Sequence, residues 1–133
     1  MVAAFPISHP ANWYFGWISL LAAFGTGAAI GLGFHREGFL GGYASFRRRI
    51  VRLGHIALAA LGLINVVFAM SPYPATDHWA ARPASFAWMA GNAAMPAVCF
   101  LSGWKPSFRS LFFIPVALLV AAVVLTLCGG PPL

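Results

Sequence analysis

The sequence predicts an all-α integral membrane protein, an antiparallel bundle of four transmembrane helices with both termini on the outer side of the membrane. The first observation behind this prediction is composition. Hydrophobic residues make up 61% of the 133 residues and charged residues only 8%. The mean hydropathy is +0.84, which lies outside the range of soluble globular chains. A soluble protein of this size exposes too large a share of its surface to hide that many apolar side chains.

The second observation is the length of the apolar stretches. Four stretches without Asp, Glu, Lys or Arg reach the roughly 20 residues (range ~17–25) that a helix needs to cross a bilayer. They cover residues 13–34, 53–70, 86–104 and 111–128. Helices are the expected form, because backbone groups in lipid must find partners within their own segment. Residues 1–133 are therefore expected to form one membrane domain, and the short connections favour an antiparallel bundle.

The third observation is the placement of the basic residues. Of the eight, only Arg82 lies between the second and third stretches; the others are Arg36, Arg47, Arg48, Arg49, Arg52, Lys105 and Arg109. The positive-inside rule then puts the first and third connections in the cytoplasm and both termini in the periplasm. Arginine in preference to lysine, with many Ala and Gly, favours a bacterial inner membrane. The net charge of +6 is explained by this topology and by anionic lipid headgroups, so no nucleic-acid partner is predicted.

The first stretch follows an uncharged segment, residues 1–12, whose prolines predict an extended arm. Asn12 at its end is a candidate N-cap for the first helix. Within that helix, small residues gather on one side. Gly27 and Gly31 form a G-xxx-G pair, which allows another helix to approach closely.

The second and third stretches each carry a stripe of polar and small residues. At 100° per residue, His55, Gly62 and Asn65 fall on one side of the second stretch. The same exercise on the third stretch gathers a second set, namely Trp88, Met89, Asn92, Met95, Pro96, Cys99 and Gly103, with Ser102 at the edge. We therefore expect these two stripes to face each other. The fourth stretch is apolar all round, which is typical of a helix that faces lipid or another subunit.

An interhelical polar contact is predicted at the level of Asn65 and Asn92. Pro96 has no N–H to donate to the carbonyl four residues earlier, which belongs to Asn92. In lipid a freed carbonyl needs another donor, and the Asn65 amide is expected at the same depth. The sequence thus predicts an Asn65–Asn92 contact that fixes the pairing of the two helices.

His55 is the main candidate for a functional side chain, and three interpretations stay open. It is a neutral imidazole bonded to Ser102 or a carbonyl, an axial ligand of a haem or chlorophyll-type pigment, or part of a lipid or quinone headgroup site. In the second, Arg48, Arg49 and Arg52 would bind the propionates or a similar anionic edge of the macrocycle; in the third, Arg52 would hold the headgroup together with His55. Proton relay is disfavoured, since no Asp or Glu lies in any of the four stretches.

The sequence favours a binding or structural role over an enzyme. It contains no nucleophile–base pair, carboxylate dyad or phosphate loop, and no dense metal-ligand cluster, so no catalytic or metal site is predicted. The leading hypothesis is a small accessory subunit of a larger energy-transducing complex, respiratory or photosynthetic, packed against other membrane subunits. The alternatives are a stand-alone haem-, pigment- or quinone-binding protein with His55 as ligand, and a homo-oligomeric pore lined by Asn65 and Asn92.

Overall fold

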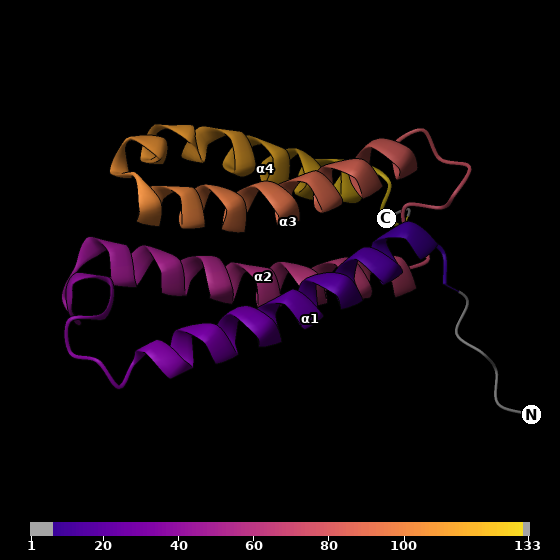
Figure 1. Cartoon of the computed structure of the whole chain (residues 1–133). Coiled ribbons are helices and arrows are strands. Elements are labelled where there is room, and N and C mark those ends of the chain that lie inside the picture. The colour runs from indigo at the N-terminus through magenta and orange to yellow at the C-terminus, as the bar shows by residue number, and fades with distance from the viewer. Residues whose placement is uncertain (1–6, 132–133) are drawn as a thin grey trace, which may run out of the picture.

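The chain folds into an all-helical bundle over residues 7–131, the part that the computed structural model describes (Figure 1). The helices are α1 (Pro10–Gly33), α2 (Phe46–Met70), α3 (Ala81–Trp104) and α4 (Phe113–Cys128), with short 3₁₀ helices η1 (Phe39–Gly41) and η2 (Pro106–Phe112). With η2 and α4 counted together, four helices of the described chain are long and apolar enough to cross a membrane. The predicted all-α membrane class is confirmed.

The helices α1, α2 and α3 begin earlier than the corresponding apolar stretches. Residue 53 was the expected start of the second span, yet α2 begins at Phe46, where the Ser45 hydroxyl accepts a hydrogen bond from the Arg48 N–H at 3.1 Å. Likewise α3 begins at Ala81, before the apolar stretch at 86. Hydropathy marks the part of a helix that suits hydrocarbon, whereas backbone hydrogen bonding continues beyond it. The arginines from 47 to 52 therefore lie on the first turns of α2.

The start of α1 differs from the prediction. Pro10 is the first residue of the helix and His9 holds the N-cap position, an arrangement that suits proline because its missing N–H would have no helical partner there. Asn12 lies inside the first turn and makes no capping bond, so the cap prediction is wrong. Residues 1–6 of the predicted arm lie outside the described residues.

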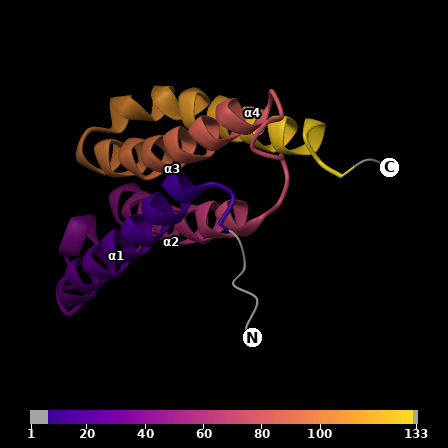
Figure 2. The ribbon, with the colours of Figure 1, turned by 90° about the vertical axis from the view of Figure 1, so that its right-hand side faces the viewer.

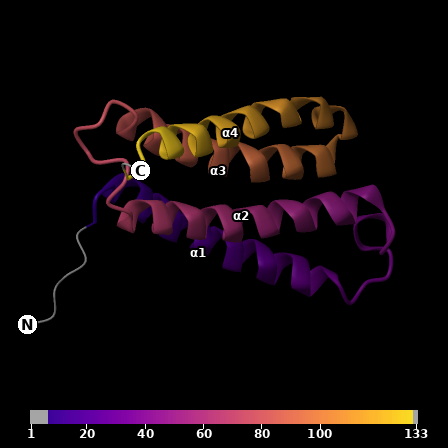
Figure 3. The same ribbon diagram turned by 180° about the vertical axis from the view of Figure 1, so that it is seen from behind.

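Each helix packs mainly on its neighbour in sequence: α1 on α2, α2 on α3, and α3 on α4, with a smaller contact between α1 and α3. Figures 2 and 3 show the resulting two layers, α1 with α2 and α3 with α4. The α1–α2 and α3–α4 connections lie at the same end of the bundle, which we call the basic end (Figure 1). The start of α1, the 71–80 loop and Gly129 meet at the other, which we call the loop end (Figure 1).

Close approach of α1 and α2 depends on two glycines. A Cβ on Gly16 would lie 2.7 Å from the carbonyl oxygen of Gly62, and a Cβ on Gly62 would lie 3.0 Å from that of Gly16. The small and polar stripe of α2 thus packs on α1 at this level, instead of on α3 as expected. Gly27, the first glycine of the G-xxx-G pair, also faces α2, while Gly31 faces open space.

The apolar core lies where α2, α3 and α4 meet. Phe68, Ala84, Ala87, Trp88 and Ala122 form one buried cluster. Buried residues on α4 are limited to Pro115 and Ala122, in line with its uniformly apolar sequence. Apart from the side that packs on α3, α4 is therefore exposed.

Candidate functional site

The basic end is held together by two arginines of α2. The Arg47 Nε donates to the Gly103 carbonyl at 2.8 Å, one of the last carbonyls of α3, which have no partner within the helix. The buried Arg48 guanidinium lies 4.5 Å from the ring centroid of Phe34 and 5.4 Å from that of Tyr43, within cation–π range. These two side chains tie the α1–α2 connection and the end of α3 to α2.

His55 lines a cleft between α1 and α2 with a volume of 150 Å³. The cleft is lined by Gly27, Ile30, Gly31, Phe34, Arg52, His55 and Ile56. A Cβ on Gly27 would lie only 2.8 Å from the His55 ring, so the ring occupies space that only glycine leaves open. In this cleft the His55 imidazole therefore packs directly against the α1 backbone at Gly27.

The tautomer of His55 follows from its partner. The Thr26 hydroxyl lies 2.9 Å from the Ala22 carbonyl and 3.1 Å from that of Ala23. When the hydroxyl donates its proton to one of these carbonyls, its oxygen accepts from the His55 Nδ1–H, 3.2 Å away. A neutral ring protonated on Nδ1 keeps a lone pair on Nε2. That atom is the one able to bind a metal or accept a hydrogen bond from a ligand.

The structure brings together only part of the predicted site. Arg52, one turn before His55, is exposed and lines the same cleft, whereas Arg49 is exposed but does not line it. Ser102 is fully buried on α3, and no hydrogen-bond partner for its hydroxyl occurs in the described part of the chain. The predicted His55–Ser102 pairing is wrong. The reason is the orientation of α2 about its own axis. Gly54 faces Cys99 of α3, so the next residue, His55, is turned by about 100° and faces α1.

A buried polar cluster joins α1, α2 and α3 near the loop end. Asn12 Nδ2 donates to Asn65 Oδ1 at 2.8 Å and to the Ser85 carbonyl at 3.2 Å, while the Ser85 hydroxyl donates to Asn12 Oδ1. Asn65 Nδ2 in turn donates to the carbonyls of Leu61 at 3.0 Å and Trp88 at 3.3 Å. Both asparagines are fully buried. One amide pair thus satisfies groups on three helices.

Asn92 bonds to α1 as well. Its Nδ2 donates to the Ser19 hydroxyl at 3.1 Å, and its buried Oδ1 finds no hydrogen-bond partner among residues 7–131. The predicted Asn65–Asn92 contact is therefore wrong, although both side chains are buried and Pro96 lies inside α3 as expected. Sequence reasoning missed Ser19 as the partner of Asn92 and Asn12 as the partner of Asn65. The signal was there, since residues 12, 16, 19 and 23 follow the helical spacing of one polar and small face.

These features define the class of the protein: a multi-pass membrane helix bundle with buried asparagines and serines between its helices and a histidine cleft on one side. Among the described residues, no group of three or more His, Cys, Asp or Glu side chains is placed to hold a metal ion. Comparisons of the chain with protein-family models, with curated proteins and with solved structures give no match.

Proposed function

We propose that this protein is a small accessory subunit of a larger energy-transducing complex, and that it contributes His55 to a ligand site at the seam with a neighbouring subunit. The observation that carries the proposal is the size and position of the His55 cleft. Its 150 Å³ is well below the ~300–1,000 Å³ of pockets that enclose a small ligand. It also opens on exposed Arg52 and Ile56. A ring-sized ligand there needs a second protein to cover its other face.

The chemistry of the cleft suits a haem, a chlorophyll-type pigment or a quinone. The His55 Nε2 lone pair is a ligand for iron or magnesium, or an acceptor for the hydroxyl of a reduced quinone. The Arg52 guanidinium supplies a cation for a propionate or a carbonyl oxygen. Gly31, where an added Cβ would meet nothing within 4 Å, leaves room on α1 for a planar ring. In this proposal Arg49 lies too far round α2 to contact the ligand and binds headgroups instead.

For the membrane topology, we propose an antiparallel bundle in a bacterial inner membrane with both termini in the periplasm. Seven of the eight basic residues lie at the basic end, either in its two connections or on the first turns of α2, which supports a cytoplasmic location for that end. Exposed arginines there, Arg49 among them, would contact anionic headgroups, each contributing about 1 kcal/mol. We propose no catalytic role and no nucleic-acid partner.

The stand-alone binder is the second candidate, and the free Nε2 of His55 supports it equally. The two are separated by whether a second chain covers the ligand. The pore has less support, because Asn65 and Asn92 are both fully buried and bonded within one chain. Side chains in that position do not line a surface at which copies meet.

Native mass spectrometry of protein released from its own membranes in mild detergent tests the proposal. We expect a hetero-complex that carries a macrocycle or quinone, and His55→Ala should lose that mass and its absorbance while the complex stays assembled. His35→Ala is the matched control, since His35 is exposed at the same end. Release without partner chains but with the cofactor would support the stand-alone binder. Release of wild type with lipid alone would contradict both.

A further inference from the structure

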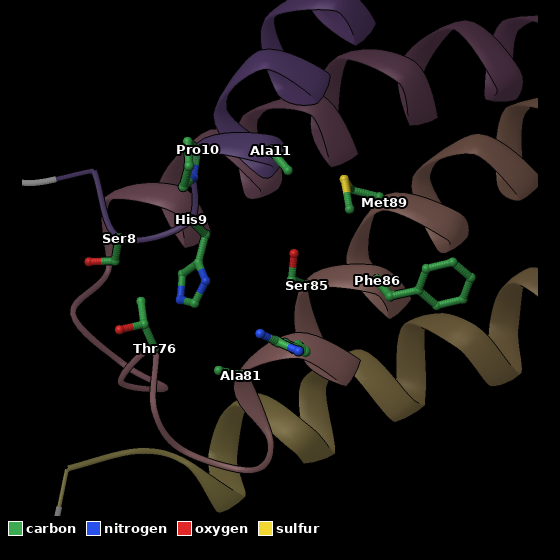
Figure 4. A pocket seen from close by; sticks show the side chains of 10 residues that line it. Ser8, His9, Pro10, Ala11, Thr76, Ala81, Ser85, Phe86 and Met89 are labelled. Atoms are coloured by element: carbon green, nitrogen blue, oxygen red, sulfur yellow. The ribbon is translucent and has the colours of Figure 1, made fainter.

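A second and larger cavity lies at the loop end, separate from the His55 cleft. Its volume is 380 Å³, within the size range of small-molecule sites. It is formed where the start of α1, the 71–80 loop and the first turns of α3 meet (Figure 4). The lining residues are Ser8, His9, Pro10, Ala11, Thr76, Ala81, Arg82, Ser85, Phe86 and Met89. None of the expected site residues contributes to it.

The cavity has a polar end and an apolar end. Figure 4 shows Ser8, His9 and Thr76 at one end and Phe86 and Met89 at the other. Arg82 is exposed and also lines the cavity. Of the eight Lys and Arg residues, it alone belongs to the connection between the second and third apolar stretches. A single cation therefore faces into an amphipathic cavity.

His9 contributes to this cavity as a neutral group. Its ring stacks on Phe68 with centroids 4.5 Å apart, and its Nε2–H donates to the Pro74 carbonyl at 3.1 Å. Burial lowers the pKa of His9, more than the bond to the carbonyl raises it. The ring is thus uncharged at neutral pH, and the positive charge of the cavity comes from Arg82.

The apolar end continues from Arg82 along one face of α3. Arg82, Phe86 and Met89 are spaced i, i+4 and i+7, so they line the same side of the helix. Phe86 is 66% exposed, and Met89 lies half-buried one turn further into the membrane. At ~1.5 Å per residue, the stripe reaches about 10 Å from the charged head inward. A ligand that follows it has a charged end at the surface and an apolar end among hydrocarbon.

We propose that this cavity binds one anionic amphiphile, with its phosphate or carboxylate head on the Arg82 guanidinium and its hydrocarbon chain along Phe86 and Met89. Guanidinium groups bind such oxyanions through paired hydrogen bonds. The hydroxyls of Ser8 and Thr76 supply further donors at the polar end. The occupant is either a phospholipid of the bilayer or a free single-chain amphiphile, which share this chemistry.

Native mass spectrometry of purified, delipidated protein tests the proposal, with binding titrated against four probes. They are phosphatidylglycerol, phosphatidylcholine, dodecyl phosphate and inorganic phosphate. We expect one tight adduct with an anionic, chain-bearing probe, and Arg82→Gln should weaken it about tenfold, the loss expected for one charged hydrogen-bonded pair. Arg109→Gln removes the same charge from an exposed position at the basic end and should leave the tight adduct unchanged.

The choice of probe identifies the source of the ligand. Preference for phosphatidylglycerol over dodecyl phosphate indicates a bilayer lipid, and the reverse indicates a free amphiphile. Met89→Trp fills the apolar end without changing charge and should weaken the chain-bearing probes only. Equal binding by wild type and Arg82→Gln, an equal loss in Arg109→Gln, or inorganic phosphate binding as tightly as the amphiphiles would each overturn the proposal. Circular dichroism of each variant verifies that the helices remain folded.

Discussion

The amide of Asn12 and the side-chain oxygen of Asn65 are joined by a 2.8 Å hydrogen bond in a fully buried position between α1 and α2. The same asparagine of α2 donates to the Trp88 carbonyl of α3. Asn65 therefore links three helices, because its side chain hydrogen-bonds to both α1 and α3. In hydrocarbon none of these groups can turn to water instead.

Asn65→Ala should destabilise the bundle by about 1–2 kcal/mol. Single interhelical bonds in membranes average ~0.6 kcal/mol, and this change removes several while leaving Asn12 Nδ2 partly unsatisfied. Unfolding by SDS in mixed micelles, followed by circular dichroism, measures the loss. Leu63→Ala is the matched control, because Leu63 is 54% exposed on the same helix. Equal stability of the two variants would contradict a linking role for Asn65.

Gly16→Ala should cost about 1–3 kcal/mol, the range for an added methyl in a packed interface. Its Cβ would meet the backbone of α2 at 2.7 Å, and backbone has no rotamer with which to move aside. Gly25→Ala on the same helix meets nothing within 4 Å and should be neutral or stabilise by up to ~1 kcal/mol through helix propensity. The same SDS unfolding assay measures both. Similar losses in the two variants would argue against the close approach at Gly16.

His55 should be protonated on Nδ1 in the ligand-free protein. The nitrogen-15 chemical shifts of the imidazole, measured by NMR in micelles, distinguish the two tautomers. Thr26→Val removes the acceptor for the Nδ1–H and should shift the population towards the Nε2–H form. Thr126→Val is the control, since Thr126 bonds to Trp88 on the other side of the bundle. Wild-type His55 with its proton on Nε2 would contradict the assignment.

Stability should fall on acidification because of His9. Burial lowers the pKa of His9 from its ordinary value of 6.5, so the unfolded chain binds a proton more readily than the folded one. The resulting stabilisation is complete above pH 6.5 and is lost as the pH falls through the lower pKa of the folded state.

Unfolding free energies between pH 7.5 and pH 5 measure this effect. His9→Phe keeps the ring stacked on Phe68 and removes the titration, so its stability should change less with pH than that of wild type. His35→Gln removes an exposed histidine and should retain the wild-type slope. A wild-type slope in His9→Phe would mean that another group is responsible.

Much of the fold can be predicted from the sequence, because a segment that crosses hydrocarbon must be apolar, about 20 residues long and helical. The four apolar stretches predicted the four helices, and the asparagines at 65 and 92 were expected to be buried. Their partners were not predicted, because a polar stripe on α2 fits a stripe on either neighbouring helix. The matching stripe on α1 contains Asn12, whose position near an expected helix start suggested a cap. Likewise, the orientation of α2 about its axis determines whether His55 faces Ser102 of α3 or Thr26 of α1, and the sequence does not fix that orientation.

The crossing of α1 and α2 at Gly16 and Gly62 has a mechanical consequence. The two helices touch backbone to backbone there and diverge towards the basic end (Figure 1). Residues 8–11 of the loop-end cavity lie on one side of this point, and Gly27 and Gly31 of the His55 cleft lie on the other. The contact at Gly16 is thus the point about which a rigid α1 would pivot on α2. If α1 tilted as a rigid body about this contact and widened the histidine cleft, residues 8–11 at the Arg82 cavity would move in the opposite direction.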